Sequence, residues 1–491
     1  MTESQPARKK QKVEKKKILI LNFFEALTPV LHAPGQWRNP RDESRNYYKA
    51  EYWIKLAKLA EKAKLHGIFW GDSLAPYDGP YNFSAAAISG NNFPKNSPME
   101  YLAAMAINTK NLAFGFTGST LSEHPYHFAR RIATLILWNV VTSFLDSAAR
   151  NLLDGNKLPD KNIRYEKADE YLQVFYELLL SSWRTDGVVF DREKGIFSDP
   201  EAIREINFEG KYFKVPGPQL TEPNPKGRIP LIAQAGASEK GLLLGAKHAE
   251  LIYVGGKSPE AVKSKIEQTK RLAQEKYGRN PDHLKFVMRV AIVVEKTSKE
   301  AKKKFEEIQK YKDIEGIQVQ IGGSGFDLSA YDWDEDLAEH SNPKAKAFAK
   351  LQAEFHPPGT KITRRLVANR FLEDSTFVGD PEEVADELED WVARSDVDGF
   401  NFTNLVFPET FENIAELLVP ELQKRGLAQT EYAVDGGSVR ENLYRKKGQV
   451  DVLEDHYTYD LHWRPGVSKE EFEKRLKSVK AKQEKLKITA D

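Results

Sequence analysis

Cysteine is absent from this chain of 491 residues. Its absence excludes disulfide bonds, thiolate metal sites and a cysteine nucleophile. A basic excess is also missing, since 73 Lys and Arg face 72 Asp and Glu for a net charge of +1, whereas dedicated nucleic-acid binders are usually basic. No apolar run approaches the roughly 18 residues of a membrane span, and the N-terminus lacks the apolar core of a signal peptide. We therefore expect an intracellular, cytoplasmic protein that binds neither nucleic acid nor membrane.

Several common cofactor motifs are missing as well. Gly255-Gly-Lys-Ser258 matches the end of a phosphate-binding loop, but the earlier glycine that the motif requires falls on Leu251. No G-x-G-x-x-G follows a predicted strand, which argues against a built-in Rossmann domain. The ten histidines are scattered, and no cluster of histidines and carboxylates has a convincing metal-ligand spacing. We therefore expect no bound metal.

The first 16 residues are polar and basic and show no apolar periodicity, so we expect a disordered tail. The cluster Arg8-Lys-Lys-Gln-Lys12 could act as a nuclear-import signal. A solvated terminus is the favoured interpretation, because basic runs are common there.

From Lys17 onward, short apolar runs alternate with segments of helical periodicity. The predicted strands are Ile18–Asn22, Gly67–Asp72, Leu112–Thr117, Trp138–Thr142, Leu231–Gln234, Leu251–Val254, Phe286–Val294 and Gly399–Thr403. The predicted helices span 52–65, 99–109, 165–180, 238–248, 259–277, 298–311, 381–393 and 410–425, with a further helix that opens at Pro125. Eight strands that alternate with helices predict an α/β fold of the (β/α)₈ barrel type.

Two long segments interrupt this alternation, and insertions of such length are usually lids or binding loops. In a barrel the active site lies at the carboxyl-terminal strand ends, where such loops collect. The predicted division is a tail at 1–16, a barrel at 17–430 with insertions at 183–229 and 313–375, and a C-terminal extension at 431–491.

The segment Pro230–Gly241 carries the most specific signal. Its apolar run breaks on Gly236, which has no Cβ to keep a ligand from the backbone, and Ser238 is a good N-cap for the helix that follows. A strand that feeds a helix N-terminus in this way exposes unpaired N–H groups and suits a phosphate. An ordinary strand-to-helix turn with a capping serine would look the same.

Other polar residues stand at predicted strand ends. Asp72 closes the second strand, where it could either accept hydrogen bonds from a ligand or cap a loop. Gly115–Thr120 ends the third strand with three hydroxyl groups, more than one structural turn explains. Arg164–Asp169 opens the helix after the fourth strand, and its charges could be simple helix decoration.

Taken together, these segments resemble the bacterial-luciferase-like flavin monooxygenases. The resemblance is to the branch with nitrilotriacetate, EDTA, dibenzothiophene-sulfone, dimethyl-sulfide and long-chain alkane monooxygenases. It runs in family order over roughly residues 17–445, although no single motif would suffice. The motifs that carry it are Trp37-Arg38, Gly67–Asp72, Gly118–Tyr126 with Ala129-Arg130, Trp138–Ser143, Arg164–Tyr171, Gly210–Phe213, Gln234–Ser238, Asp398–Asn401 and Val419–Gly426.

The resemblance implies a barrel that binds reduced FMN, supplied by a separate NAD(P)H-dependent flavin reductase, and uses O₂ to oxygenate a small organic substrate. It also implies a homo-oligomer. By the same resemblance, Ser238 with Gly236 and Ala237 holds the FMN phosphate, Asp72 and Ser119 contact the flavin, and Tyr165 lines the same pocket. Aromatic residues Trp37, Tyr77 and Tyr81 suggest an apolar wall, although they could also be ordinary core.

Two departures from the family pattern bear on activity. The family usually has a histidine four residues before the tyrosine of its H-x-x-R-Y element, where this chain has Lys161 before Tyr165; a lysine cannot act as a neutral imidazole. The stretch Thr134–Asn139 is also shorter than the family's, by about the length of one strand, ~5–6 residues. The junction before the fourth strand must therefore be rebuilt, or that strand shortened.

Three functions stay open from the sequence. The favoured one is a two-component FMN-dependent monooxygenase. The second is a flavin-binding relative with impaired or no catalysis, suggested by Lys161 and the shortened junction. The third is a different barrel enzyme such as a hydrolase, which is disfavoured because no carboxylate pair or nucleophile-base spacing stands out.

Overall fold

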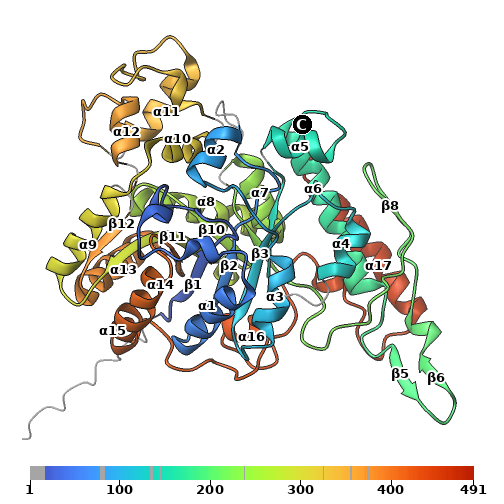
Figure 1. Ribbon diagram of the computed structural model, residues 1–491. Coiled ribbons are helices and arrows are strands. Elements are labelled where there is room, and N and C mark those ends of the chain that lie inside the picture. The colour runs from blue at the N-terminus through green and yellow to red at the C-terminus, as the bar shows by residue number, and fades with distance from the viewer. Residues whose placement is uncertain are drawn as a thin grey trace, which may run out of the picture.

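The computed structural model describes residues 17–77, 83–132, 137–143, 145–236, 238–323, 326–353, 356–370, 372 and 376–490. Eight parallel strands form a closed barrel, because β10 pairs with both β9 and β11 (Figure 1). The predicted (β/α)₈ barrel is therefore confirmed. The barrel strands are β1 (Ile20–Glu25), β2 (Gly67–Trp70), β3 (Ala113–Ser119), β4 (Leu137–Val141), β9 (Leu231–Gln234), β10 (Leu251–Val254), β11 (Lys285–Val294) and β13 (Gly399–Thr403).

Helices surround the barrel at the places where the apolar periodicity predicts them. Ser258 caps the helix α8 and Pro259 opens it, while Gly278 ends it at φ 66°, so its bounds follow from local signals. The surrounding helices are α1 (Ala50–Lys62), α3 (Met99–Ala106), α4 (Pro125–Ile132), α6 (Lys161–Tyr176), α7 (Glu239–His248), α8 (Pro259–Tyr277), α9 (Ser298–Lys310), α13 (Pro381–Ser395), α14 (Glu409–Asn413) and α15 (Val419–Lys424). Short π-helical turns continue α6 over Glu177–Ser181 and join α14 to α15 over Ile414–Leu418.

The region of the apparent deletion is only partly described. The helix α4 ends at Ile132 and β4 begins at Leu137, and the residues between them lie outside the described part of the chain. β4 nevertheless has five residues and pairs along its whole length with β3. The fourth strand is thus not shortened relative to β2, β9 or β10, each of which has four residues.

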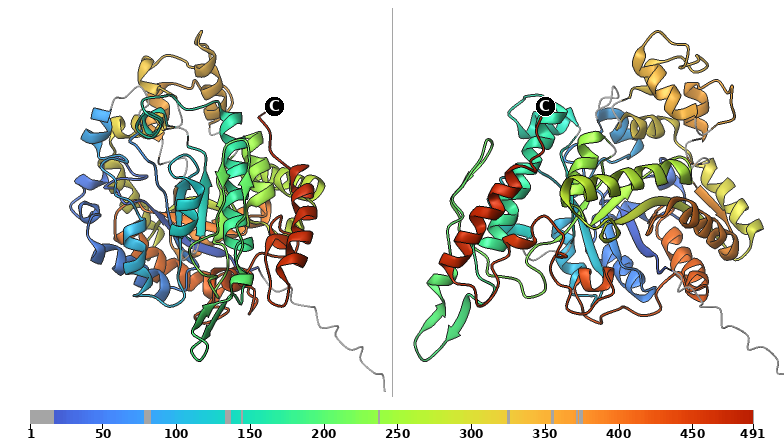
Figure 2. Two further views of the ribbon diagram at one scale, coloured as in Figure 1. Left: turned by 90° about the vertical axis from the view of Figure 1, so that its right-hand side faces the viewer. Right: turned by 180° about the vertical axis from the view of Figure 1, so that it is seen from behind.

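The two insertions lie at different places on the barrel (Figures 1 and 2). Segment 313–375 contains α10 (Ile314–Gly322), α11 (Pro343–Ala353) and α12 (Arg364–Arg370) and sits above the barrel in Figure 1, with α10 packed against α2 (Phe83–Ser89). After it, β12 (Thr376–Gly379) pairs with the second half of β11. Segment 183–229 projects to the right in Figure 1 and forms two small hairpins, β5 (Val188–Asp191) with β6 (Ile196–Ser198) and β7 (Phe208–Glu209) with β8 (Lys214–Val215).

Two of the motifs that carry the family resemblance meet in a structural contact. The buried carboxylate of Glu170 in α6 accepts hydrogen bonds from the backbone N–H groups of Lys211, Tyr212 and Phe213 at 2.7–2.9 Å. A Cβ at Gly210 would lie 2.3 Å from the same carboxylate, so only glycine fits there. These contacts hold the 183–229 insertion against α6, so the residues that make them have a structural role.

The C-terminal extension covers the barrel in two ways. The helix α16 (Val439–Leu443) lies below the barrel in Figure 1, where Val439 and Leu443 pack against the amino-terminal ends of the strands. The helix α17 (Lys469–Glu484), capped by Ser468, lies alongside α6 (Figure 2) and joins it through an ion pair between Lys480 and Glu177 at 2.6 Å. A further short helix, α5 (Asp146–Leu152), follows β4. In the described residues, no helix is long and apolar enough to cross a membrane.

Candidate functional site

A cavity of about 270 Å³ opens at the carboxyl-terminal ends of the barrel strands. We call it the central cavity. Side chains from all around the barrel reach it because the carboxyl ends of parallel strands meet at one end of the barrel. Its lining includes Phe24, Phe69, Asp72, Thr117, Asn139, Ala235, Tyr253, Arg289 and Asn401 from the strands and their ends, together with His32, Tyr77, Lys95 and Gln320 from loops and the helix α10.

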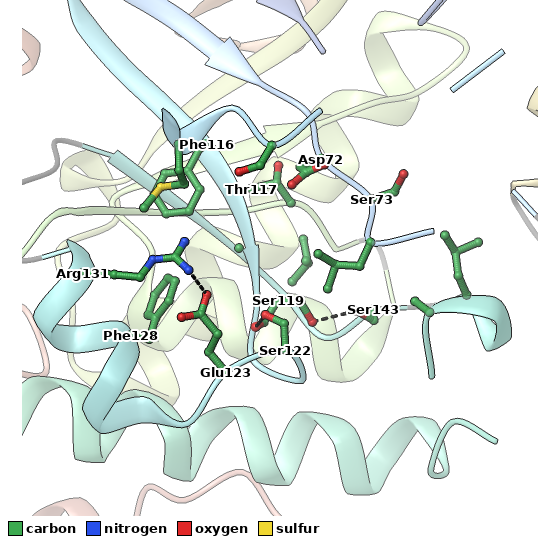
Figure 3. A pocket seen from close by; sticks show the side chains of 17 residues that line it. Asp72, Ser73, Phe116, Thr117, Ser119, Ser122, Glu123, Phe128, Arg131 and Ser143 are labelled. Atoms are coloured by element: carbon green, nitrogen blue, oxygen red, sulfur yellow. Dashed lines mark hydrogen bonds and ion pairs between the residues drawn. The ribbon is translucent and has the colours of Figure 1, made fainter. Parts of the chain in front are cut away.

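A second cavity of about 220 Å³, the side cavity, lies next to the central one between the loops that follow β2, β3 and β4 (Figure 3). Asp72, Ser73 and Thr117 line both cavities. Figure 3 shows Glu123 and Arg131 paired in its wall, at a distance of 2.7 Å between Oε1 and Nη1. The two cavities therefore form adjoining spaces above the barrel, and they share Asp72.

Asp72 lies two residues beyond the end of β2 rather than in the strand. Burial raises the pKa of its carboxyl group to about 6, while the nearby ammonium group of Lys95 acts in the opposite direction. A carboxylate whose pKa is perturbed in a cleft is a candidate for function. At neutral pH it is ionised and can accept hydrogen bonds from a ligand.

Ser119 ends β3 with its side chain 6% exposed. Its hydroxyl group lies 2.7 Å from that of Ser143, and both line the side cavity (Figure 3). Arg164 donates to the carbonyl oxygen atoms of Thr142 and Ser143 and so holds the end of β4 in place. Arg164 therefore shapes the side cavity from behind.

The start of α7 forms a small cradle of donors. Ser238 caps the helix by accepting a hydrogen bond from the N–H of Gly241 at 3.2 Å. The hydroxyl group of Tyr165 lies close by, because a Cβ at Gly236 would be 3.2 Å from it and one at Gly241 would be 3.0 Å. Two glycines and a helix N-terminus thus surround the tyrosine oxygen, and any side chain at Gly236 would fill this space.

The structure brings the predicted site residues together in two groups. Asp72 and Ser119 line the side cavity, and Tyr165, Gly236 and Ser238 form the cradle. Ala235, the residue before the cradle, lines the central cavity, which also contains Asp72. Ala237 lies outside the described residues.

Other residues that the sequence singled out take different positions. Lys161 is exposed at the first turn of α6, which begins four residues earlier than predicted because Asp160 caps it through the N–H of Asn162. Trp37 is 46% exposed and lines neither cavity, whereas Tyr77 does line the central one. Tyr81 lies outside the described residues.

Sequence reasoning missed three basic residues of the central cavity, His32, Lys95 and Arg289. Arg289 did leave a signal, since it is a lone charge inside the apolar run of β11. His32 and Lys95 lie in loops and show no pattern by which they could be placed near it. Tertiary structure alone assembles this group.

These features fit a phosphorylated flavin. A helix N-terminus with glycines beside it suits a phosphate, and the adjoining cavity offers the aromatic side chains of Phe24, Phe69 and Tyr253 to a flat ring. The side-chain oxygen of Gln234, at the end of β9, is buried and has no hydrogen-bond partner in the described part of the protein. It marks the same region as a place where polar contacts are left for a ligand.

The family model for luciferase-like monooxygenases matches residues 32–398. The chain belongs to this family. A long-chain alkane monooxygenase from Geobacillus thermodenitrificans (strain NG80-2) is 40% identical over 446 residues, which cover 89% of this chain and 96% of that protein. A dimethyl-sulfide monooxygenase from Hyphomicrobium sulfonivorans is 36% identical, with 87% of this chain and 90% of the relative covered.

Two solved structures share the fold of this chain. A crystal structure of long-chain alkane monooxygenase superimposes with a TM-score of 0.82 at 39% identity and covers 90% of this chain and 100% of its own. A crystal structure of riboflavin lyase with modified FMN and riboflavin gives a TM-score of 0.81 at 28% identity and covers 91% and 100%. The chain is therefore a monooxygenase of the luciferase-like flavin family.

Proposed function

We propose that this protein is the oxygenating component of a two-component system that uses reduced FMN and O₂ to oxygenate a small organic substrate. The observation that carries the proposal is the cradle at the start of α7, formed by Gly236, Ser238 and Tyr165 and preceded by Ala235, which lines the central cavity. One ligand would place its phosphate in the cradle and its flat ring system in the cavity. When bound, reduced FMN would supply the electrons and the O₂ chemistry.

The protein's own residues would bind and orient the cofactor and shield it from water. The hydroxyl group of Tyr165, Ser238 and the N–H groups at the start of α7 would hold the phosphate. Asp72, which lines both cavities, would contact the flavin from the end of β2, and Ser119 would contact it from the adjoining side cavity at the end of β3. Helix α10 contributes Gln320 to the cavity wall and so would help to exclude water during the reaction.

A separate NAD(P)H-dependent flavin reductase would provide the reduced cofactor, and the active protein would be a homo-oligomer. Membership of the family supports both expectations. The reductase would deliver a diffusible cofactor, so the cradle has to recognise the FMN phosphate without help from the partner.

Rapid mixing of the protein with photoreduced FMN and oxygenated buffer tests the proposal without any reductase. We expect a transient absorbance distinct from that of both oxidised and reduced FMN, since a shielded site delays release of the oxygen as peroxide. Tight FMN binding with immediate peroxide release would instead support a flavin-binding relative that has lost catalysis. If the protein does not bind FMN, the proposed FMN-dependent function is wrong.

A further inference from the structure

The central cavity carries more positive than negative charge. Arg289 lies in β11 between buried apolar neighbours, yet its side chain is exposed, and the space it faces is the cavity. Lys95, from the segment before α3, lines the same cavity. Among the described residues of the lining, Asp72 is the carboxylate that opposes these two cations.

The guanidinium group of Arg289 is oriented but mostly unpaired. Its Nη1 donates to Nδ1 of His32 at 3.0 Å. Burial, with the charges of Arg289 and Lys95, lowers the pKa of His32 well below its ordinary value, so the imidazole is neutral and can accept this bond. The contact uses one of the five N–H donors of arginine, and no other described residue accepts from Arg289. The remaining donors form a planar fork that matches a carboxylate.

The ammonium group of Lys95 is held by neutral oxygen atoms. It donates to Oδ1 of Asn92 at 2.9 Å and to the hydroxyl oxygen of Ser73 at 3.0 Å. Neither contact neutralises its charge, and a third donor is left over. Asp72 and Glu25 act on Lys95 only from beyond ion-pair distance. Lys95 therefore keeps a positive charge available to a ligand.

We propose that the substrate of this monooxygenase carries a carboxylate, which Arg289 binds through its fork while Lys95 supplies a second positive charge. The inference rests on the proposed function in that the substrate occupies the cavity where the flavin ring also lies. The organic part of the substrate would rest on the aromatic wall formed by Phe24, Phe69 and Tyr253. A neutral apolar molecule of equal length would leave both cations desolvated and without a counter-charge, which is unfavourable.

Binding of octanoate and of octanamide, which differ in charge at one end, tests this proposal by calorimetry with and without oxidised FMN. We expect octanoate to bind at least tenfold more tightly at pH 7, because one charge-assisted hydrogen bond accounts for roughly ten- to a hundredfold in affinity. Arg289→Gln and Lys95→Gln should each lose most of this preference. Arg289→Lys should keep part of it, because the charge remains and the fork is lost.

Arg131→Gln is the matched control, since Arg131 lines the side cavity and is already paired with Glu123. It should leave the octanoate preference and FMN binding unchanged. Equal binding of octanoate and octanamide to the wild-type protein would overturn the carboxylate site. So would a loss of FMN affinity in Arg289→Gln and Lys95→Gln without an effect on octanoate, because the cations would then serve the cofactor. If the protein binds no FMN but still prefers octanoate in a way that depends on Arg289, the anion site is supported and the proposed function is wrong.

Discussion

At the amino-terminal end of the barrel, Arg440 of α16 donates to both carboxylate oxygen atoms of Glu250, at 2.6 and 2.8 Å, and to the carbonyl oxygen atoms of Ile229 and Pro230. Both side chains of this pair are almost fully buried. Burial alone would raise the pKa of Glu250, but the guanidinium group of Arg440 holds it below its ordinary value. At the carboxyl-terminal end, Arg289 makes one hydrogen bond to a neutral histidine and keeps its other donors facing a cavity.

The same residue type thus has opposite surroundings at the two ends. Where every donor is matched, the arginine contributes to folding, because breaking a buried pair leaves an uncompensated charge. Where the donors are left open to a cavity, the arginine is available to a ligand. This difference agrees with the general division of labour in such barrels, in which one end gives stability and the other carries the active site.

The largest expected effect is a loss of stability at the amino-terminal end of the barrel. Glu250→Ala should lower the free energy of unfolding by about 3–5 kcal/mol, because it strands the buried Arg440. Arg289→Gln should change it by less than about 1 kcal/mol. Urea unfolding followed by circular dichroism measures both. A similar loss of stability in the two variants would show that the contrast between the ends is false.

The next effect lies at the start of α7. Ser238→Ala should weaken FMN about tenfold or more, since a charge-assisted hydrogen bond to phosphate is worth roughly 1.5–3 kcal/mol. Riboflavin, which has no phosphate, should bind almost as before. Gly236→Val should weaken FMN further, because its side chain would fill the space beside Gly241 and Tyr165 where the phosphate would lie. Fluorescence titration with the two flavins reports these affinities.

Ser258→Ala is the control for the cradle. Ser258 caps α8 in the same manner as Ser238 caps α7, with its oxygen accepting an N–H at 3.2 Å. Both variants should lose a similar amount of stability, about 1 kcal/mol for an N-cap, but only Ser238→Ala should affect FMN. Equal losses for FMN and riboflavin in Ser238→Ala would mean that the turn is purely structural.

The smallest expected effect is a pH dependence of octanoate binding at the carboxyl-terminal end of the barrel. Burial lowers the pKa of Lys95 to about 8, against the opposing charges of Asp72 and Glu25. Lys95 is therefore charged below about pH 8 and neutral above it, so octanoate should bind several-fold less tightly as the pH rises through this value. His32 stays neutral throughout this range, and Asp72, with a pKa of about 6, is already ionised.

Glu25 is a second group whose charge changes over this pH interval, so Glu25→Gln serves as the control. Burial raises its pKa to about 8, so it gains a negative charge in the same interval and would also disfavour an anion. Lys95→Gln should flatten most of the pH dependence of octanoate binding, whereas Glu25→Gln should retain it. A flat profile in Glu25→Gln alone would assign the effect to the carboxyl group and leave Lys95 without a part in it.

Much of the fold was predictable because its signals are local. The strands 231–234, 251–254 and 399–403 and the helix 259–277 have the predicted bounds, since each is a short apolar run or a capped periodic segment. The helices α2, α5, α10, α11, α12 and α16 were not predicted, because short helices are held by neighbours in space rather than by their own periodicity. The start of α6 was misplaced because the capping role of Asp160 was overlooked.

Periodicity, caps and ordered motifs are properties of neighbouring residues, so they were enough to predict the barrel, the turn at Gly236–Ser238 and membership of a flavin monooxygenase family. Tertiary structure alone brings Lys95 and Arg289, almost two hundred residues apart along the chain, to one cavity, and it pairs the equally charged Arg440 with the buried Glu250. Barrel closure brings distant strand ends together, and which charges meet there depends on strand register and loop path. Neither of these is encoded in any local pattern.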